Sequence, residues 1–272
     1  MIFNSPERVA AFTPLAPFGR LPDGRPLVPD ELLARMKLVT NDEAWGVVAK
    51  ERGYRFQFEG GWFNLHPERV LVGRAVTARF VPLRPDFEET VQRWGAAEDR
   101  SGGENTWVID QLQPGDVLVV DLFGKIEDGT FIGDNLGTAV AARAGTGLVI
   151  DGGIRDLERV FALPDFNVFC RGAHPSAIAD VTLAEVNGPL RIGAASVLPG
   201  DVVLGTREGV TFVPPHLAEE VAATSANVRQ RDVFGKETIA AGVYTSGEID
   251  VPVWADRIED HYRRWIAARR RR

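Results

Sequence analysis

The order of secondary-structure elements between residues 114 and 172 most constrains the fold of this chain. An apolar, β-branched run after the turn at 114–116 predicts a strand, and the alanine-rich segment from Leu136 to Ala144 predicts a helix. "LVIDGG" (148–153) then predicts a buried strand, "RDLERVFAL" a helix and "FNVFCRG" a third strand. Alternating strands and helices are typical of a parallel sheet covered by helices. The sequence therefore predicts an α/β fold with a central parallel sheet.

The rest of the chain divides into three predicted parts: an extended N-terminal arm over residues 1–29, the α/β domain over 30–214, and a C-terminal helical extension over 215–272. The arm contains six prolines, which remove amide donors and fix φ. A helix is expected to begin near Pro29, and "EAWGVVAKERG" predicts a second helix that ends at Gly53. "RVLVGRAVTARFVPL" predicts a strand pair or one bent strand, followed by a helix, a polar loop and a helix.

Two segments of the chain share one pattern. "QPGDVLVVDLFGKIEDGTFIGD" and "LPGDVVLGTREGVTFVP" each begin with a Pro-Gly-Asp turn, followed by an apolar strand, a glycine-containing turn and a second strand. The repetition predicts a sheet with approximate internal symmetry. Four aromatic side chains in the arm and the C-terminal extension are expected to pack against a neighbouring subunit: Phe12, Phe18, Trp254 and Trp265.

Composition and charge exclude several function classes. The net charge of −7 disfavours nucleic-acid binding, and the basic run at Arg269–Arg272 is interpreted as a solvated end. The single cysteine, Cys170, allows no intrachain disulfide and lies in an apolar run, so a buried, inert thiol is expected. The sequence contains no apparent signal peptide and no apolar run of about 18 residues. We therefore expect a cytoplasmic protein that does not bind membranes.

The glycines near the second strand do not match a dinucleotide-binding loop. That loop requires a strand, then glycines, then a helix, so that the pyrophosphate meets a helix N-terminus. Here "AGTG" (144–147) follows a helix and precedes a strand. It is better interpreted as a helix C-cap and a tight turn.

Two other loops are expected to meet at the carboxyl edge of the sheet, where α/β proteins bind ligands. The loop Gly133-Asp134-Asn135-Leu136 precedes a helix, whose first backbone amides favour an anion. The loop 151–156 follows a strand and carries Arg155 and Asp156. Arginine binds a carboxylate with two parallel hydrogen bonds, and one or two carboxylates with open water positions suit Mg²⁺ or Mn²⁺.

Structural roles compete with this interpretation. Asp134 and Asp156 each lie at the start of a predicted helix, where capping that helix could be the whole role of the side chain. Arg155 could be an ordinary surface residue. Asp151 is interpreted as structural, tying the turn "DGG". Two glycine turns, each with a carboxylate and one with an arginine, together favour a functional site.

The stretch "GDNLGTAVAARAGTGLVIDGGIRD" resembles the signature of the RraA-like superfamily, in particular its 4-hydroxy-4-methyl-2-oxoglutarate aldolase and oxaloacetate decarboxylase branch. The signature has an Asp, twenty intervening residues and then Arg-Asp; Asn135 through Ile154 separate Asp134 from Arg155 here. A looser similarity runs from about Val70 to Pro214, a little over half of the chain. The resemblance implies a swivelling β/β/α-type domain and a homo-oligomer, a trimer or a hexamer, with active sites between subunits.

The resemblance also implies a role for each residue of the signature. Arg155 would bind the carboxylate or keto oxygen of a 2-oxo acid, and the amides of Gly133, Asp134, Asn135 and Leu136 would hold its carboxylate. Asp156 would hold a divalent metal, Mg²⁺ or Mn²⁺, largely through waters, and Asp134 would orient a water or a proton donor. This chain departs from the family with Asn135 in place of an apolar residue and Arg171 in place of a lysine. His174 is either a proton-transfer group or structural.

The expected activity is that of a class II, metal-dependent pyruvate aldolase. It would cleave a 4-hydroxy-2-oxo acid to release pyruvate, decarboxylate oxaloacetate, or do both, because both reactions form the enolate of pyruvate. The alternative is a non-catalytic regulator of the RraA type that binds a protein partner from RNA degradation.

Overall fold

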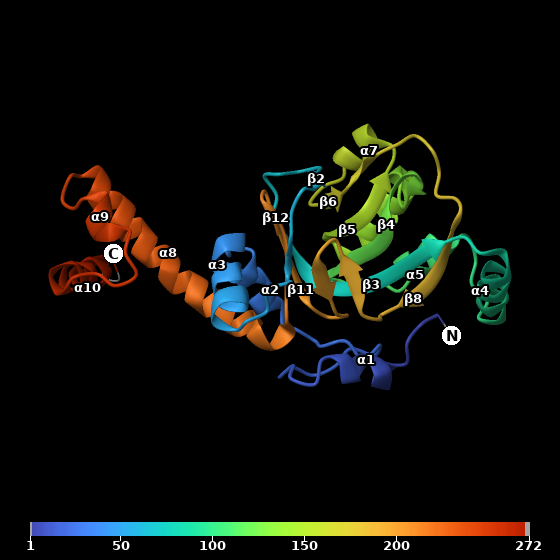
Figure 1. Cartoon of the computed structure of the whole chain (residues 1–272), viewed down its shortest axis with the longest axis horizontal. Coiled ribbons are helices and arrows are strands. Elements are labelled where there is room, and N and C mark those ends of the chain that lie inside the picture. Colours follow the sequence, from blue (N-terminus) through green and yellow to red (C-terminus); the bar gives the residue numbers. More distant parts are fainter. Residues whose placement is uncertain (1, 270–272) are drawn as a thin grey trace. The chain divides into compact units, whose positions relative to one another are not determined.

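The computed structural model describes residues 2–269. The chain divides into two compact units, and the boundary along the sequence lies between Ala222 and Ala223. The first unit contains the sheet and most of the helices (Figure 1). The second unit is helical.

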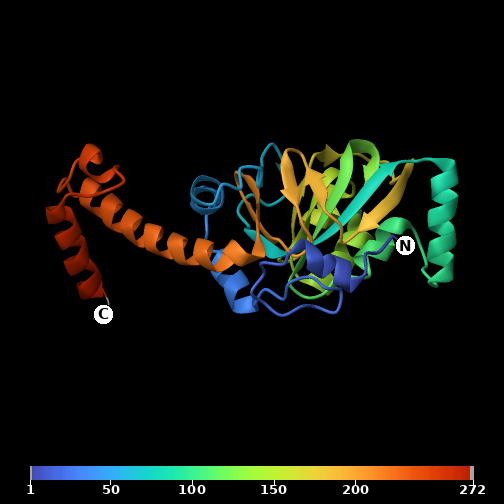
Figure 2. The same ribbon diagram turned by 60° about the horizontal axis from the view of Figure 1, so that its bottom comes forward.

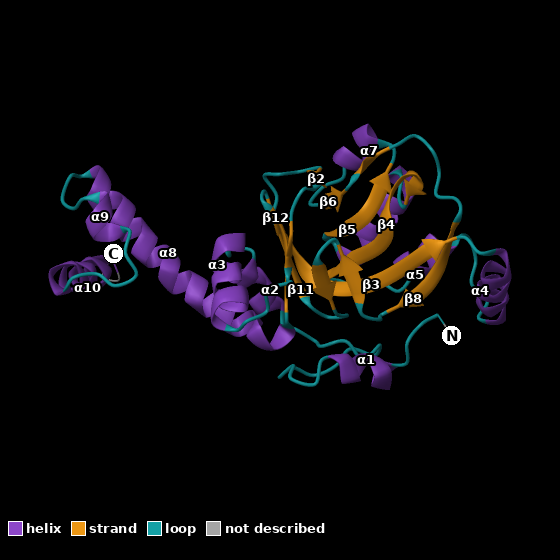
Figure 3. Cartoon of the chain, viewed as in Figure 1, coloured by secondary structure: helices purple, strands orange, loops and turns teal. Residues whose placement is uncertain are grey.

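The sheet of the first unit has a parallel centre and antiparallel borders (Figure 3). Strands β3, β4, β5 and β6 pair in parallel, while β11, β12, β1, β2 and β8 pair antiparallel with their neighbours. The predicted parallel sheet is thus confirmed at its centre. The strands are β1 (Phe58–Glu59), β2 (Phe63–Asn64), β3 (Leu71–Pro82), β4 (Asp116–Thr130), β5 (Gly147–Ile154), β6 (Asn167–Cys170), β7 (Gly172–Ala173), β8 (Val181–Val186), β9 (Leu190–Ile192), β10 (Ala195–Val197), β11 (Val202–Thr206) and β12 (Gly209–Val213).

The described helices follow the predicted order. The segment 30–36 is helical as expected, and the helix from Asn41 continues as a π-helical turn from Gly46. The arm, expected to be extended, contains one helix, which Ser5 caps and Pro6 begins. The helices are α1 (Pro6–Phe12), α2 (Asp30–Met36), α3 (Asn41–Trp45), η1 (Gly46–Glu51), α4 (Pro85–Ala97), α5 (Glu104–Ile109), α6 (Asp134–Ala144), α7 (Leu157–Phe161), η2 (Pro215–Leu217), α8 (Ala218–Ala240), α9 (Ser246–Ile249) and α10 (Asp256–Arg269).

Both faces of the central strands are buried, which explains their continuous apolar sequence. Leu118 and Val120 of β4 enter one hydrophobic cluster, whereas Val117 and Val119 enter another on the opposite side. Alternate residues of a strand point to opposite faces, so a strand that is covered on both sides needs apolar residues at every position. The first cluster also contains Val140 of α6, which packs this helix onto the sheet.

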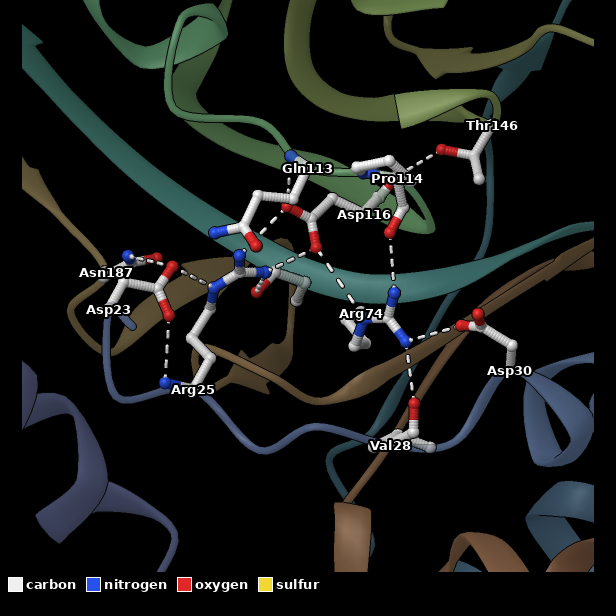
Figure 4. A network of polar contacts seen from close by, with 11 residues as sticks. Asp23, Arg25, Val28, Asp30, Arg74, Gln113, Pro114, Asp116, Thr146 and Asn187 are labelled. Atoms are coloured by element: carbon white, nitrogen blue, oxygen red, sulfur yellow. Dashed lines mark hydrogen bonds and ion pairs between the residues drawn. The ribbon is translucent and has the colours of Figure 1, made fainter. Parts of the chain in front are cut away.

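The arm is held on its own chain by a buried ion pair. Arg25 donates from Nη1 to Asp116 Oδ1 at 2.8 Å and from Nη2 to Asp116 Oδ2 at 2.9 Å, and neither side chain is exposed (Figure 4). Nearby, Arg74 donates to the Val28 carbonyl at 2.7 Å. Phe18 packs, partly buried, against a core cluster of its own chain, and its expected contact with a neighbouring subunit stays a prediction. Figure 2 shows the arm in dark blue, running along one side of the sheet.

The second unit has a small aromatic core of its own. Phe234 and Ile258 are buried together with Trp254, whose indole NH donates to the Ile249 carbonyl at 2.8 Å. Trp254 was expected to pack across subunits; it packs inside its own unit because Phe234 and Tyr262 surround its ring. Residues 270–272 of the basic tail lie outside the described residues, and Arg269 pairs with Glu237. None of the helices within residues 2–269 combines the length and the apolar character that crossing a membrane requires.

Candidate active site

The loops that follow β4 and β5 meet at the carboxyl edge of the sheet, as the sequence predicted. The Arg155 amide donates to the Ile132 carbonyl at 3.0 Å, and the Phe131 amide donates to the Gly153 carbonyl at the same distance. β4 and β5 run parallel, so their ends lie at one edge, and these bonds tie the two loops together. Helix α6 begins after one loop, at Asp134, and α7 begins after the other, at Leu157.

Gly133 permits a close approach between the two loops. A Cβ atom at this position would lie 2.3 Å from Asp156 Oδ2 and 3.0 Å from Arg155 Nε. Its φ of −116° is accessible to any residue, so proximity explains the glycine and backbone strain does not. The absence of a side chain at Gly133 thus makes room for the two charged groups of the Arg155-Asp156 pair.

Asp156 does not serve merely as a helix cap. It occupies the N-cap position of α7 without making a side-chain cap hydrogen bond, and its backbone is left-handed, with φ 56° and ψ 42°. Instead, its Oδ2 accepts a long hydrogen bond of 3.4 Å from the Asp134 amide, and its side chain is 40% exposed. Asp and Asn adopt this left-handed backbone more readily than other non-glycine residues, so the conformation is tolerated at Asp156.

Asp134 is held as a carboxylate. Its Oδ2 accepts from Arg159 Nη1 at 3.0 Å, and its Oδ1 accepts from the Asn135 amide at 2.9 Å. The hydrogen bond from Arg159 lowers the pKa of Asp134, against a smaller effect of desolvation. The N-cap of α6 is Gly133, so the alternative role of Asp134 as a cap is not realised. Two of the loop amides expected to bind an anion, those of Asp134 and Asn135, already donate to carboxylates of the chain.

Arg155 presents an available guanidinium group. Its Nε lies 3.6 Å from Asp156 Oδ2, its side chain is 42% exposed, and its terminal nitrogens have no hydrogen-bond partner within residues 2–269. It borders a cavity of about 90 Å³, which is also lined by Asn105, Thr130, Phe131, Gly133, Asp134, Asn135, Leu136, Ala177 and Ile178. All four residues of the predicted loop 133–136 therefore share one cavity with Arg155.

Several residues near this site were not predicted from the sequence, among them Arg159, Asn105 and Ile178. Arg159 lies one helical turn after Asp156, a spacing that could have indicated it. Asn105, whose Nδ2 donates to the Phe131 carbonyl at 2.9 Å, and Ile178 come from segments distant in sequence. No local sequence signal marks these two residues.

Arg171 and His174 do not line this cavity. Arg171 donates to Asp151 at 2.6 Å and to Glu59 at 2.8 Å, and it stacks on Trp62. Asp151 therefore holds Arg171. The expectation that its side chain stabilises a turn at residues 151–153 is wrong, because these residues belong to strand β5. His174 Nδ1 lies 2.9 Å from Ser176 Oγ. Cys170 is buried, and desolvation raises its pKa to about 12, as expected of an inert thiol.

The residues at this edge fit a divalent metal that takes few protein ligands. Within residues 2–269 there is no cluster of three or more His, Cys, Asp or Glu side chains placed to hold a metal. Asp156 offers a half-exposed carboxylate whose one described hydrogen bond is long. Mg²⁺ retains several waters and is commonly bound by one or two carboxylates together with its substrate. This donor set is compatible with such an ion and unlike a closed metal cage.

Comparison with known proteins decides the family. Residues 40–212 match the family described as "RraA-like: Aldolase/RraA". The chain belongs to the RraA-like family. The crystal structure of Streptomyces coelicolor RraAS2, described as an unusual member of the RNase ES inhibitor RraA protein family, superposes with a TM-score of 0.65 at 27% identity. That alignment covers 81% of this chain and 99% of RraAS2.

Several curated relatives of this chain carry aldolase names. A protein of Halalkalibacterium halodurans, "Putative 4-hydroxy-4-methyl-2-oxoglutarate aldolase", is 33% identical over 143 residues, which are 50% of this chain and 65% of the relative. The "4-hydroxy-4-methyl-2-oxoglutarate aldolase" of Thermus thermophilus is 29% identical over 107 residues, which are 39% of this chain and 64% of that protein. The chain thus spans a little under two thirds of each of these relatives.

Proposed function

We propose that this RraA-like protein is a divalent-metal-dependent lyase that cleaves a 4-hydroxy-2-oxo acid to release pyruvate and that also decarboxylates oxaloacetate. The observation that carries the proposal is the convergence of Arg155, Asp156 and Asp134 on one edge of the sheet, beside a small cavity. The names of the aldolase relatives support the same chemistry.

The residues of the site divide the chemistry between them. In the retro-aldol reaction the 4-hydroxyl loses its proton, the C3–C4 bond breaks, and its electron pair forms the enolate of pyruvate, which then takes a proton at C3. Arg155 binds the 2-oxo acid with its free terminal nitrogens and stabilises the oxyanion that develops at C2. In oxaloacetate the same bond breaks with loss of CO₂, so one oxyanion site serves both reactions.

The two carboxylates have different tasks. Asp156 would hold Mg²⁺ or Mn²⁺, and a bound ion would supply positive charge beside the keto oxygen. Asp134 is paired with Arg159 and stays ionised, so it orients a water molecule that carries the proton. It does not act as the acid itself, because its pKa is lowered.

We also infer that the active protein is a homo-oligomer, a trimer or a hexamer. The cavity of about 90 Å³ is smaller than the roughly 300–1,000 Å³ of typical ligand sites. Within residues 2–269 its lining contains no histidine and no acidic residue other than Asp134. A neighbouring subunit would complete both the pocket and the proton-transfer groups. Light scattering of the full chain tests this inference, and a monomer that turns over substrate would contradict it.

The test of the lyase is pyruvate release over a panel of 4-hydroxy-2-oxo acids and oxaloacetate. We expect release with Mg²⁺ or Mn²⁺, loss of activity in EDTA, and recovery when the metal is returned in excess. Activity that persists in EDTA after dialysis would contradict the metal requirement and leave the lyase assignment standing.

A regulator of RNA degradation is the second candidate, because the superposition with this chain covers nearly the whole length of RraAS2. In that case Arg155 and Asp156 touch no reacting group. Pull-down of a purified ribonuclease E, together with the absence of pyruvate release, would favour this alternative.

A further inference from the structure

The two Pro-Gly-Asp turns of the repeated pattern have the same internal structure. In the turn 114–116, Asp116 Oδ2 accepts from the Gln113 amide at 2.9 Å. In the turn 199–201, Asp201 Oδ2 accepts from the Leu198 amide at 2.8 Å. The central glycines have φ values of 80° and 87°, which favour glycine. Each turn leads into a strand, β4 or β11.

The two carboxylates differ in the group that balances their charge. Asp116 is fully buried and receives both terminal nitrogens of Arg25 (Figure 4). Asp201 is almost as deeply buried, at 2% exposed, but forms no ion pair within residues 2–269. Its only described side-chain hydrogen bond is the one from Leu198, and Oδ1 has none. A buried carboxylate normally has a cationic partner, because desolvation of a charge is costly.

The arm explains why the second turn lacks a cation. Arg25 reaches the first turn, while the next residue, Pro26, packs on the second. A Cβ atom on Gly200 would lie 2.4 Å from Pro26 Cδ. The arm therefore places a guanidinium group at one turn and an apolar ring at the other.

Asp201 lies in the wall of a mostly apolar cavity of about 270 Å³. The arm, Tyr54 and the segment before α8 contribute to its lining. The lining residues are Phe12, Thr13, Pro14, Leu15, Tyr54, Gln57, Ser196, Leu198, Asp201, Pro214, Pro215 and His216. Tyr54 Oη lies 3.2 Å from His216 Nε2. Aromatic rings beside a carboxylate are features of sites that bind organic cations. The volume is close to the lower end of the roughly 300–1,000 Å³ of small-molecule sites.

We propose that this cavity binds a small organic cation, an ammonium or guanidinium group on an apolar body, with Asp201 as its counter-ion. The cation takes at Asp201 the place that Arg25 takes at Asp116. The apolar body lies against Leu15, Leu198 and the prolines of the cavity wall. This site is separate from the cavity at Arg155 and does not depend on the lyase activity.

Binding is coupled to ionisation of Asp201. Burial raises its pKa to about 7, partly offset by the hydrogen bond from Leu198. Among the residues that line the cavity, the other titratable side chains are Tyr54 and His216, and burial lowers the pKa of His216. A cation binds the ionised carboxylate, so affinity rises with pH up to about 7 and is level above it. Below pH 7 the change approaches about tenfold per pH unit for one linked proton.

Isothermal titration of the full chain with benzylammonium and with butylguanidinium tests this site. We expect saturable binding at pH 8, at least about tenfold weaker binding at pH 6, and no binding of benzyl alcohol, the neutral counterpart. Asp201→Asn should abolish binding, whereas Glu89→Gln, which alters an exposed carboxylate, should not. If Asp201→Asn is poorly folded, Leu15→Trp, which enlarges an exposed residue of the cavity lining, should also abolish binding.

Two outcomes would overturn the proposal. One is the absence of saturable binding of either cation by the wild type at pH 8. The other is equal binding by the wild type and a folded Asp201→Asn variant. In one form of the first outcome, the wild type binds neither cation and Asp201→Asn differs from it in oligomeric state, as measured by sedimentation. That combination would show that a basic side chain of a second copy occupies the cavity instead.

Discussion

The amide of Asp134 donates to the carboxylate of Asp156 across 22 positions of sequence, at 3.4 Å. This contact explains the spacing of the signature in physical terms. Helix α6, the turn at Gly145 and strand β5 together carry the chain away from the sheet edge and back to it. A change in that length would separate the two carboxylates.

Gly133→Ala should lower activity without unfolding the protein. The added methyl group would lie 2.3 Å from Asp156 Oδ2, and the half-exposed Asp156 and Arg155 side chains can move aside more easily than buried backbone. We expect a fall in kcat/KM of at least about tenfold and a change in the free energy of unfolding within about 0.5–1 kcal/mol. Steady-state pyruvate release and urea unfolding check this. Gly247→Ala, at a position with open space, is the control. Unchanged activity in Gly133→Ala would show that the close approach is not required.

Asp156→Asn should weaken metal binding while leaving the fold intact. Asparagine tolerates the left-handed backbone of this residue and removes the charge. Mn²⁺ titration followed by electron paramagnetic resonance gives a readout that is independent of turnover. Glu158→Gln, an exposed change in α7, should bind Mn²⁺ like the wild type. Equal Mn²⁺ affinity in Asp156→Asn would remove this residue from the metal site.

Removal of one partner from the buried Arg25–Asp116 pair should be strongly destabilising. Among the described residues, Arg25→Met leaves Asp116 with only the more distant Arg74 as a charged partner, and Asp116→Asn leaves Arg25 with only Asp23. Either change breaks the fully buried pair, which typically costs about 3–5 kcal/mol. The double variant should recover part of that loss. Asp201→Asn, in the equivalent turn, should cost far less because no cation is left unpaired. Urea unfolding at pH 7 compares the four variants with the wild type, and equal losses for Asp116→Asn and Asp201→Asn would contradict the proposed difference between the turns.

Glu104 should destabilise the folded protein increasingly as pH rises from about 4.5 to 7. Burial raises the pKa of Glu104 to about 7, with a hydrogen bond from the Leu183 amide opposing the shift and Glu88 adding to it. The folded protein therefore binds a proton that the unfolded chain has already lost, so the penalty grows across this window and is constant above it. Glu104→Gln removes the titration. Its melting temperature relative to the wild type should increase between pH 5 and pH 8; a constant difference would show that Glu104 does not titrate there.

The sequence predicted the local parts of the fold better than its long-range contacts. Periodicity and glycine breaks placed the elements from β4 to β6, because a covered parallel strand is apolar at every position. The segment 69–83, predicted as a strand pair or one bent strand, forms the single strand β3. The antiparallel borders of the sheet depend on pairing between distant segments, such as β11 with β3, which no local pattern encodes.

At the candidate site, too, the local motif was predictable and the long-range contacts were not. The motif identified Asp134, Arg155 and Asp156, and the meeting of the two loops followed from parallel strand order. The expected anion site of free amides is modified by contacts of the chain itself, since two amides already bind carboxylates. Asn105 enters from a helix far away in sequence, and Arg25 reaches Asp116 across 91 positions. Both contacts arise from tertiary packing, so residue type alone could not indicate them.

The most direct test of the lyase is steady-state pyruvate release by the wild type, Arg155→Lys and Arg155→Ala, with Mg²⁺ or Mn²⁺ present and spontaneous oxaloacetate decay subtracted. Lysine keeps the charge of Arg155 but loses the planar pair of donors. The proposed mechanism predicts pyruvate release by the wild type, a fall in kcat of about 10²–10³ in Arg155→Lys that exceeds any rise in KM, and almost no turnover in Arg155→Ala. All three proteins should have similar thermal melts. The absence of pyruvate release by the wild type from every acid in the panel would contradict the lyase and favour the regulator.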